Sequence, residues 1–96
     1  MPEAVFHIEL ITPLGRLIST DALYIELPGE DGRLGIMAGH QPAIIGLEAG
    51  TLMLRDSAGQ TTLWTIGRGH TTITPLGVTV VTREASPDTQ TTKPTA

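Results

Sequence analysis

The chain has 96 residues, a formal net charge of -4 at pH 7 and no cysteine. This length allows one domain at most. The acidic balance argues against nucleic acid as a partner, because nucleic acid selects for clustered Lys and Arg. The lack of cysteine excludes disulfides and thiolate metal sites. Aromatic residues are only 3% of the chain, which also disfavours binding by stacking.

The N-terminal part of the chain is predicted to form strands. Residues 5–12 alternate between apolar and polar side chains, as a half-buried strand requires. A turn is expected at 12–15, where proline and glycine occur together. Residues 16–19 and 22–27 are then predicted to be two strands, separated by a turn at Asp21.

Residues 27–42 are the densest in glycine and proline, and they contain two expected loops. One loop surrounds Glu30 and Asp31, the other surrounds His40, and a short apolar segment separates them. Such a composition indicates tight turns and backbone conformations that side chains would forbid. We expect this stretch to hold a fixed shape.

The remainder of the chain continues the pattern of short strands and turns, and no window has helical length and periodicity. This pattern predicts an all-β fold, either a sandwich or a barrel. From Ala85 the composition changes to small and polar residues, so residues 1–84 are expected to form the domain and residues 85–96 a disordered tail. Further strands are expected at 43–46, 51–55, 61–66, 70–74 and 77–82.

The polar residues offer little evidence for catalysis. The three histidines, His7, His40 and His70, lack the close spacing that fixes two metal ligands on one element. Glu30 and Asp31 lie in an exposed turn, where a raised carboxyl pKa is not expected. Solvated turn residues are the simplest interpretation, with partner binding as the alternative. No catalytic, cofactor-binding or metal-binding residue is predicted.

Three segments together resemble the N-terminal β-sandwich domain of the epsilon subunit of F-type ATP synthases. They are Phe6–Arg16, Leu27–Pro42 and Thr74–Val80, in collinear order within residues 5–84. The central segment is the most specific, because it matches both loops at the family's spacing. The resemblance implies two packed, mainly antiparallel sheets, which is the sandwich alternative.

The same resemblance implies a non-catalytic subunit of the central stalk, or rotor. Such a subunit binds the gamma subunit and the c-ring, and it helps couple ion flow to ATP synthesis. It would be peripheral to the cytoplasmic side of a bacterial inner membrane. The gamma interface is expected near Thr12, His40 and Ala43. The expected c-ring contacts are Glu30, Asp31, Gly32, Gly39, His40, Gln41 and Pro42.

Three features of the chain depart from the family. Ala38 stands where many members have proline, so the His40 loop is expected to be less stiff. Arg68 stands where no charge is expected, and its partner cannot be read from the sequence. Many members also continue into a helical hairpin that can inhibit ATP hydrolysis, whereas this chain has the polar segment 85–96. We therefore expect a naturally short form that lacks the hairpin. The alternatives are a free-standing β-sandwich ligand-binding module and a small metal-dependent β-barrel enzyme.

Overall fold

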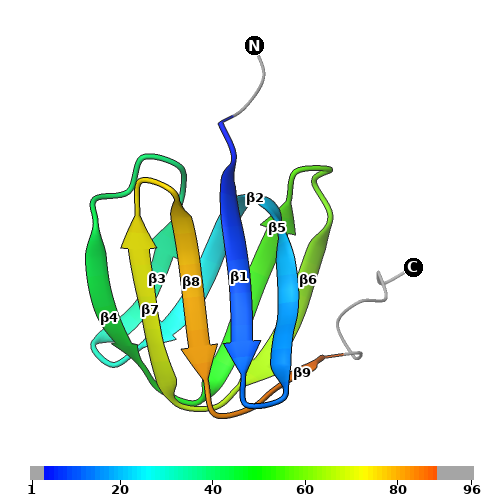
Figure 1. The fold of residues 1–96 in the computed structure, drawn as a ribbon, viewed down its shortest axis with the longest axis vertical. Coiled ribbons are helices and arrows are strands. Elements are labelled where there is room, and N and C mark those ends of the chain that lie inside the picture. Colours follow the sequence, from blue (N-terminus) through cyan, green and yellow to red (C-terminus); the bar gives the residue numbers. More distant parts are fainter. Residues whose placement is uncertain (1–3, 89–96) are drawn as a thin grey trace.

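The structure is a computed structural model that describes residues 4–88 (Figure 1). Within this range there are nine strands and no helix, hence no helix long and apolar enough to cross a membrane. The strands are β1 (Phe6–Thr12), β2 (Gly15–Gly29), β3 (Gly32–Ile36), β4 (Ala43–Leu47), β5 (Gly50–Asp56), β6 (Thr61–Ile66), β7 (Gly69–Thr74), β8 (Gly77–Thr82) and β9 (Ala85–Pro87).

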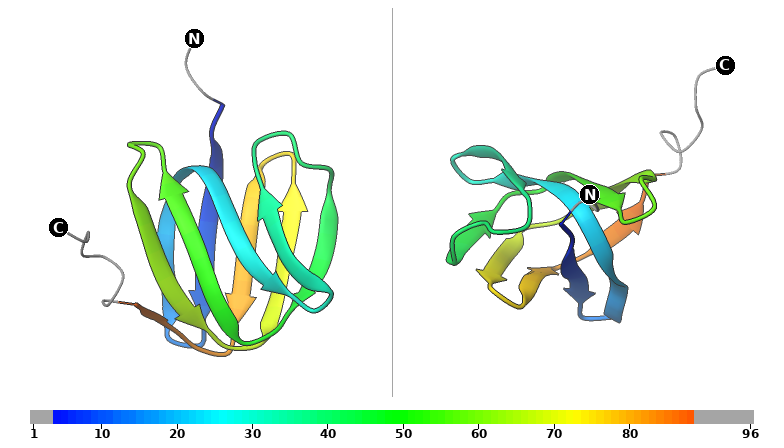
Figure 2. Two further views of the ribbon diagram at one scale, coloured as in Figure 1. Left: turned by 180° about the vertical axis from the view of Figure 1, so that it is seen from behind. Right: turned by 90° about the horizontal axis from the view of Figure 1, so that it is seen from above.

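The strands form two layers that pack face to face (Figures 1 and 2). The first layer contains the N-terminal half of β2 with β1, β8, β7 and β4. The second contains β3, the C-terminal half of β2, β5, β6 and β9. All pairs are antiparallel except β1 with β8. The predicted two-sheet, mainly antiparallel sandwich is therefore confirmed.

The long strand β2 belongs to both layers, and the predicted turn at Asp21 is wrong. β2 pairs with β1 through its first half and with β5 through its second, and its register shifts between Ala22 and Tyr24. An irregularity of this kind bends a strand without ending it. Ala22 is fully buried at the crossing, while Asp21 points outward and contacts His7 of β1.

The core lies between the layers and is almost entirely aliphatic. Alternate residues point inward along each central strand, as in Ile8 and Leu10 on β1 or Leu52 and Leu54 on β5. Burial of each such side chain contributes about 1.5–3 kcal/mol. Trp64 of β6 is half-buried and packs against the edge of this core. Because alternate residues of each strand fill this core, the residues between them face outward.

The ordered domain extends beyond the predicted boundary at Glu84. Residues Ala85–Pro87 form β9 and pair with β6, and the Asp88 N–H donates a 2.8 Å hydrogen bond to the Leu63 carbonyl oxygen. The polar composition concealed this strand, because its stability comes from backbone pairing and from Ala85 packing on the core. The rest of the predicted tail, residues 89–96, lies outside the described residues.

Candidate functional site

The acidic turn, Glu30 and Asp31, is a two-residue hairpin loop between β2 and β3. It is closed by the pairing of Gly29 with Gly32. Gly32 has φ near +124°, a conformation that side chains with a Cβ rarely adopt. Both acidic residues are exposed. The glycine therefore fixes the shape of the turn, and the carboxylates form its surface.

Glu30 is tied to the first layer, whereas Asp31 is not. The Glu30 N–H donates to the Gly46 carbonyl oxygen of β4 at 3.0 Å, and the Glu48 N–H donates to the Pro28 carbonyl oxygen at 2.8 Å. The Glu30 side chain also lies over Gly46, where a Cβ would come within 2.6 Å of the carboxyl carbon. Asp31 is thus the carboxylate that projects from the end of the hairpin.

The His40 loop, residues 37–42, joins β3 to β4 and is stabilised by its own backbone. The His40 N–H donates to the Met37 carbonyl oxygen at 3.2 Å, and Gly39 has φ near +89°. The His40 Nδ1 lies 2.8 Å from the Gln41 carbonyl oxygen, so this nitrogen is the donor. Met37 is 62% exposed. The loop therefore presents a histidine and an apolar side chain together.

The two predicted loops lie at opposite ends of β3 (Figures 1 and 2). β3 has five residues and so separates them by roughly 16 Å. The acidic turn adjoins Ile44–Gly46 of β4 around a hollow of about 470 Å³. The His40 loop adjoins the start of β1 and the β7–β8 turn around another hollow, of about 520 Å³. The loops share the β3–β4 side of the sandwich without forming one cluster.

The three residues expected at the gamma interface do not all lie together. Ala43 is half-buried at the start of β4, directly after the His40 loop. Thr12 is at the far end of β1, is only 6% exposed, and its Oγ1 accepts a hydrogen bond from the Leu14 N–H at 3.1 Å. Its side chain therefore closes the β1–β2 turn. That turn presents Leu14, which is 90% exposed.

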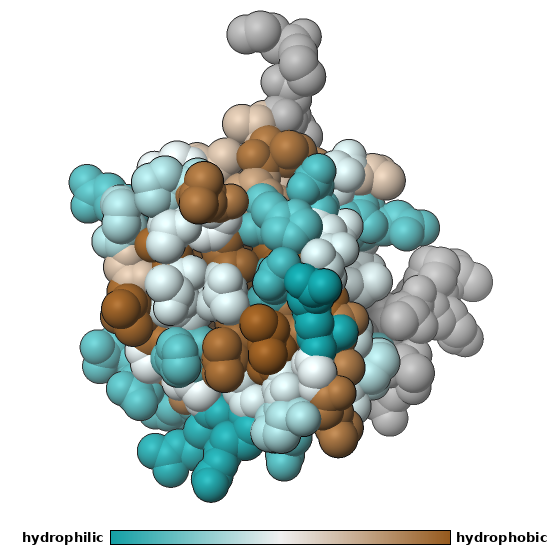
Figure 3. Space-filling view, in the orientation of Figure 1, coloured by the Kyte–Doolittle hydropathy of each residue, from teal (hydrophilic) through white to brown (hydrophobic). Residues whose placement is uncertain are grey.

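The outward side of the first layer, here called the first face, presents hydrophilic and hydrophobic residues together (Figure 3), and its charged residues form a network of pairs. His7 Nδ1 lies 3.3 Å from Asp21, and its Nε2 lies 3.1 Å from Ser19 and 3.5 Å from Glu9. Arg16 in turn contacts Glu9 at 3.2 Å. Ser19, His7 and Asp21 contact one another in the same sequence as the members of a catalytic triad. Acyl transfer, however, needs hydrogen-bond donors fixed in a site that excludes water, and this sheet face is open to water. The network is open to water, and the same face also carries the side chain of Ile44 of β4, which is 77% exposed.

The histidines do not converge on a metal site. His7 and His40 line the same hollow, whereas His70 lies on β7 near the opposite end, beside Thr12 and Arg68. Among residues 4–88, no group of three or more His, Asp or Glu side chains is placed to hold a metal ion.

Arg68 lies at the same end of the molecule as the acidic turn. It lines a hollow of about 460 Å³ together with Glu30 and Glu48. Its carbonyl oxygen accepts a hydrogen bond from the Arg83 N–H at 3.0 Å, which holds the β6–β7 turn in place. In the described part of the chain, no ion pair involves Arg68, Glu30 or Asp31. This end therefore presents charges without internal partners.

A second polar group, on the outward side of the second layer, was missed by sequence reasoning. The Tyr24 hydroxyl donates to Glu26 Oε2 at 2.8 Å, and Arg33 Nε donates to Glu26 Oε1 at 3.3 Å. Tyr24 crosses over Gly35 of β3, where a Cβ would collide with its hydroxyl. The hydrogen bond to Glu26 raises the pKa of the Tyr24 phenol. Tyr24 and Glu26 are two positions apart, which places them on the same face of a strand, and this spacing could have predicted their contact.

The fold defines a class of protein: a small β-sandwich with exposed, charged loops at its ends. Comparison with known proteins specifies the class further. The family described as ATP synthase, Delta/Epsilon chain, beta-sandwich domain matches residues 5–88, and the chain belongs to this family.

Curated relatives agree with this assignment. The ATP synthase epsilon chain of Campylobacter lari is 35% identical over 81 residues, which are 84% of this chain and 62% of that protein. The epsilon chain of Desulforapulum autotrophicum is 31% identical over 85 residues, which are 88% of this chain and 62% of that protein. The chain therefore spans about three fifths of the length of these relatives.

Solved structures share the fold. A chain of the Euglena gracilis mitochondrial ATP synthase, in a structure of OSCP, F1 and c-ring, superposes with a TM-score of 0.82 at 22% identity. The match covers 88% of this chain and 54% of that one. A chain from the central stalk and c-ring of the Tetrahymena thermophila enzyme has a TM-score of 0.73 at 14% identity, covering 90% and 69%.

Proposed function

We propose that the chain is a non-catalytic subunit of the central stalk of an F-type ATP synthase. In this role it binds the gamma subunit and the c-ring and helps couple ion flow to ATP synthesis, without a cofactor of its own. It is peripheral to the cytoplasmic side of the membrane through the complex. The observation that carries the proposal is the family match over residues 5–88, nearly the whole described domain.

The ring-binding surface in this proposal is the β3–β4 side of the sandwich. Its contacts are the acidic turn with Gly32 at one end of β3, and Gly39, His40, Gln41 and Pro42 at the other. A ring surface that meets both must extend along β3 for roughly 16 Å. Both loops are held by backbone hydrogen bonds, so little conformational entropy is lost on docking. Rigid contacts suit a joint that transmits torque.

Asp31 is the carboxylate that meets the ring in this arrangement. Glu30 is folded against Gly46, which leaves Asp31 at the end of the hairpin. An exposed ion pair with a basic ring residue contributes about 0.2–1 kcal/mol, so its main effects are on orientation and on the rate of encounter.

The gamma-binding surface in this proposal begins at His40 and Ala43. These residues adjoin the hollow that the β7–β8 turn and the start of β1 also line. Leu76 in that turn is 91% exposed and Met37 is 62% exposed, so this end offers apolar side chains to a partner beside its histidines. Thr12 lies at the other end of β1, and it contributes to gamma binding only by stabilising the β1–β2 turn.

Co-purification tests this function. The chain is expected to capture purified gamma subunit and detergent-solubilised c-ring. Glu30→Lys with Asp31→Lys is expected to weaken ring capture several-fold at low salt, and less as salt rises, because exposed charge pairs are screened. Glu84→Lys is the control, since this exposed carboxylate lies outside the acidic turn.

A chain that folds but captures neither gamma nor the ring would overturn the proposal. If the Glu30→Lys, Asp31→Lys variant captures the ring as well as the unaltered chain at every salt concentration, only the role assigned to the acidic turn is wrong.

A further inference from the structure

Two arginines lie opposite one another at the end of the sandwich that carries the acidic turn. Arg68 lies in the β6–β7 turn and Arg83 follows β8, and both connections are at this end (Figure 1). The β7–β8 pairing ends at Gly69 and Thr82. Just beyond it, the Arg83 N–H donates to the Arg68 carbonyl oxygen at 3.0 Å. The two residues, here called the arginine pair, are therefore directly across from each other, and both are exposed.

The arginine pair has no counter-ion in the described part of the chain. Arg16 and Arg33 each contact a glutamate, at 3.2 and 3.3 Å. By contrast, no ion pair or side-chain hydrogen bond among residues 4–88 involves the guanidinium group of Arg68 or Arg83. Like charges directly opposite each other on paired strands lower stability. An anion that contacts both groups would relieve this repulsion.

Three carboxylates at this end leave the arginine pair unneutralised. The Glu84 side chain lies over Gly67, where a Cβ would come within 3.0 Å of its Cγ. Glu30 and Glu48 line a hollow with Arg68, yet neither forms an ion pair with it in the structure of residues 4–88. The positive charge of the pair is therefore available to an anion from outside the described residues.

A hollow of about 370 Å³ adjoins the arginine pair. Both arginines line it, together with His70 of β7 and the apolar residues Ile11 and Val81, which are partners on β1 and β8. The His70 ring has an N–H donor whether it is neutral or protonated. The hollow thus combines two guanidinium groups, an imidazole and apolar surface, and among residues 4–88 no carboxylate belongs to its lining.

The backbone around the arginine pair is fixed before a ligand arrives. Gly69 lies so close to β8 that a Cβ in its place would collide with the Val81 carbonyl oxygen. The hydrogen bond between Arg83 and Arg68 extends this contact past the ends of the strands. A site whose backbone is already ordered loses less conformational entropy on binding.

The donor groups of the hollow favour a phosphate over a carboxylate. An arginine guanidinium donates two parallel hydrogen bonds to two oxygens of one ligand. A carboxylate has only two oxygens, so one arginine satisfies it, whereas a phosphate has further oxygens and a larger negative charge. We infer that this hollow binds a phosphate group that contacts both Arg68 and Arg83, supplied by inorganic phosphate or by the headgroup of an anionic phospholipid. The inference concerns the chain alone and does not depend on the proposed function.

An NMR titration of the full chain with inorganic phosphate tests the site. The backbone amide shifts of Gly69, His70 and Arg83 are expected to change with saturation, beyond the effect of chloride at equal ionic strength. Arg68→Gln and Arg83→Gln are each expected to weaken the apparent affinity several-fold. Arg55→Gln is the matched control and should leave it unchanged, because Arg55 on β5 is also exposed and lies outside the hollow. The same spectra verify that each variant is folded.

Vesicle co-sedimentation distinguishes the two sources of phosphate. Vesicles of phosphatidylcholine with phosphatidic acid are compared with vesicles of phosphatidylcholine alone. Saturable binding of inorganic phosphate without vesicle capture identifies free phosphate as the ligand. Capture by the phosphatidic acid vesicles that Arg68→Gln and Arg83→Gln abolish identifies a headgroup.

Two outcomes would overturn the inference. One is the absence of both a saturable phosphate response and capture by the phosphatidic acid vesicles. The other is one common affinity for Arg55→Gln, Arg68→Gln and Arg83→Gln, since binding would then not depend on the arginine pair. Either result leaves the proposed binding of gamma and the c-ring unaffected.

Discussion

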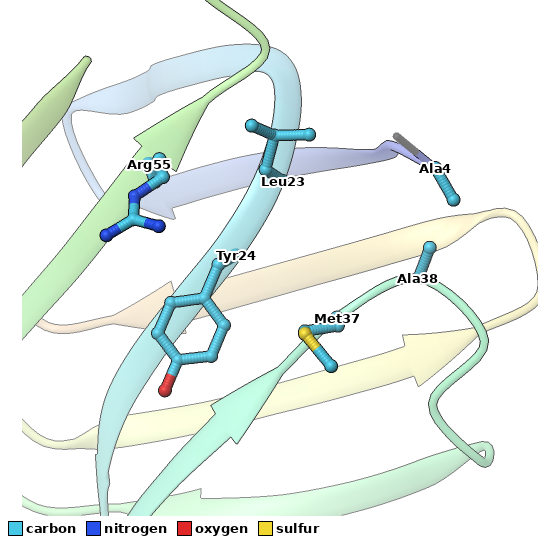
Figure 4. A pocket seen from close by; sticks show the side chains of 6 residues that line it. All are labelled: Ala4, Leu23, Tyr24, Met37, Ala38 and Arg55. Atoms are coloured by element: carbon cyan, nitrogen blue, oxygen red, sulfur yellow. The ribbon is translucent and has the colours of Figure 1, made fainter. Parts of the chain in front are cut away.

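The two outer faces of the sandwich differ in how they use their charges. On the first face, His7, Glu9 and Asp21 contact one another or nearby polar groups, and Arg16 completes the network. On the outward side of the second layer, here called the second face, Tyr24 bonds to Glu26 and lies over Gly35. Arg55 extends beside it (Figure 4) and has no ion pair among residues 4–88. Both faces are built from the same alternating strand pattern, so the fold alone does not explain the difference.

This contrast indicates which face is available to a partner. Charges that already have partners on an exposed sheet gain little from a new one, since surface pairs are worth about 0.2–1 kcal/mol. An unpaired arginine beside apolar surface gains a charged hydrogen bond and buries that surface on docking. The second face therefore keeps an unpaired charge for a partner, whereas the first face combines its paired charges with exposed apolar side chains such as that of Ile44 on β4, which is 77% exposed.

The largest effect on the second face is expected from Gly35→Ala. The new Cβ would collide with the Tyr24 hydroxyl and displace the ring. We expect unfolding free energy to fall by about 1–3 kcal/mol, as overpacking usually causes. Chemical denaturation followed by far-UV circular dichroism measures it.

A double-mutant cycle with Tyr24→Ala isolates the cause of that loss. In the Tyr24→Ala background, Gly35→Ala should be far less costly, giving a coupling of about 0.5–3 kcal/mol. Additive effects of the two substitutions would show that Gly35 does not support Tyr24.

A smaller effect is expected in the pH dependence of stability. The hydrogen bond to Glu26, then burial, raises the pKa of the Tyr24 phenol above its ordinary value of 10.0. The unfolded chain therefore loses this proton at lower pH than the folded chain. The corresponding stability is complete below pH 10 and disappears as pH rises through the folded-state pKa.

Tyr24→Phe is expected to reduce this alkaline loss of stability. Melting temperatures between pH 8 and pH 11 give the comparison, and the other residues that titrate in this range are common to both chains. Identical alkaline slopes for the two chains would contradict the role assigned to the Tyr24–Glu26 hydrogen bond.

Much of the fold could be predicted from the sequence because it depends on local patterns. Alternation identified β1, and glycine-rich turns identified the hairpin at Glu30 and the loop at His40. Two errors arose where tertiary structure overrides local signals. Asp21 was read as a turn residue, yet it pairs with His7 across two strands. The strand Ala85–Pro87 has no apolar pattern and is formed by pairing with β6.

The arrangement of the site was less predictable. The sequence placed the acidic turn and the His40 loop close together along the chain, but β3 separates them in space. Tyr24 and Arg55 are 31 positions apart, and only the pairing of β2 with β5 brings them together. Long-range strand register is not encoded in local composition, which is why the pairing of Tyr24 with Arg55 was not predicted.

Hydroxyl-radical footprinting of the chain with and without gamma tests the central claim most directly. Met37 and Leu76 mark the end of the sandwich where gamma is proposed to bind, and Leu17 and His70 mark the other end of the first layer. We predict that oxidation of Met37 and Leu76 falls several-fold in the complex while oxidation of Leu17 and His70 is unaffected. Protection of Leu17 and His70, with Met37 and Leu76 still reactive, would contradict the account.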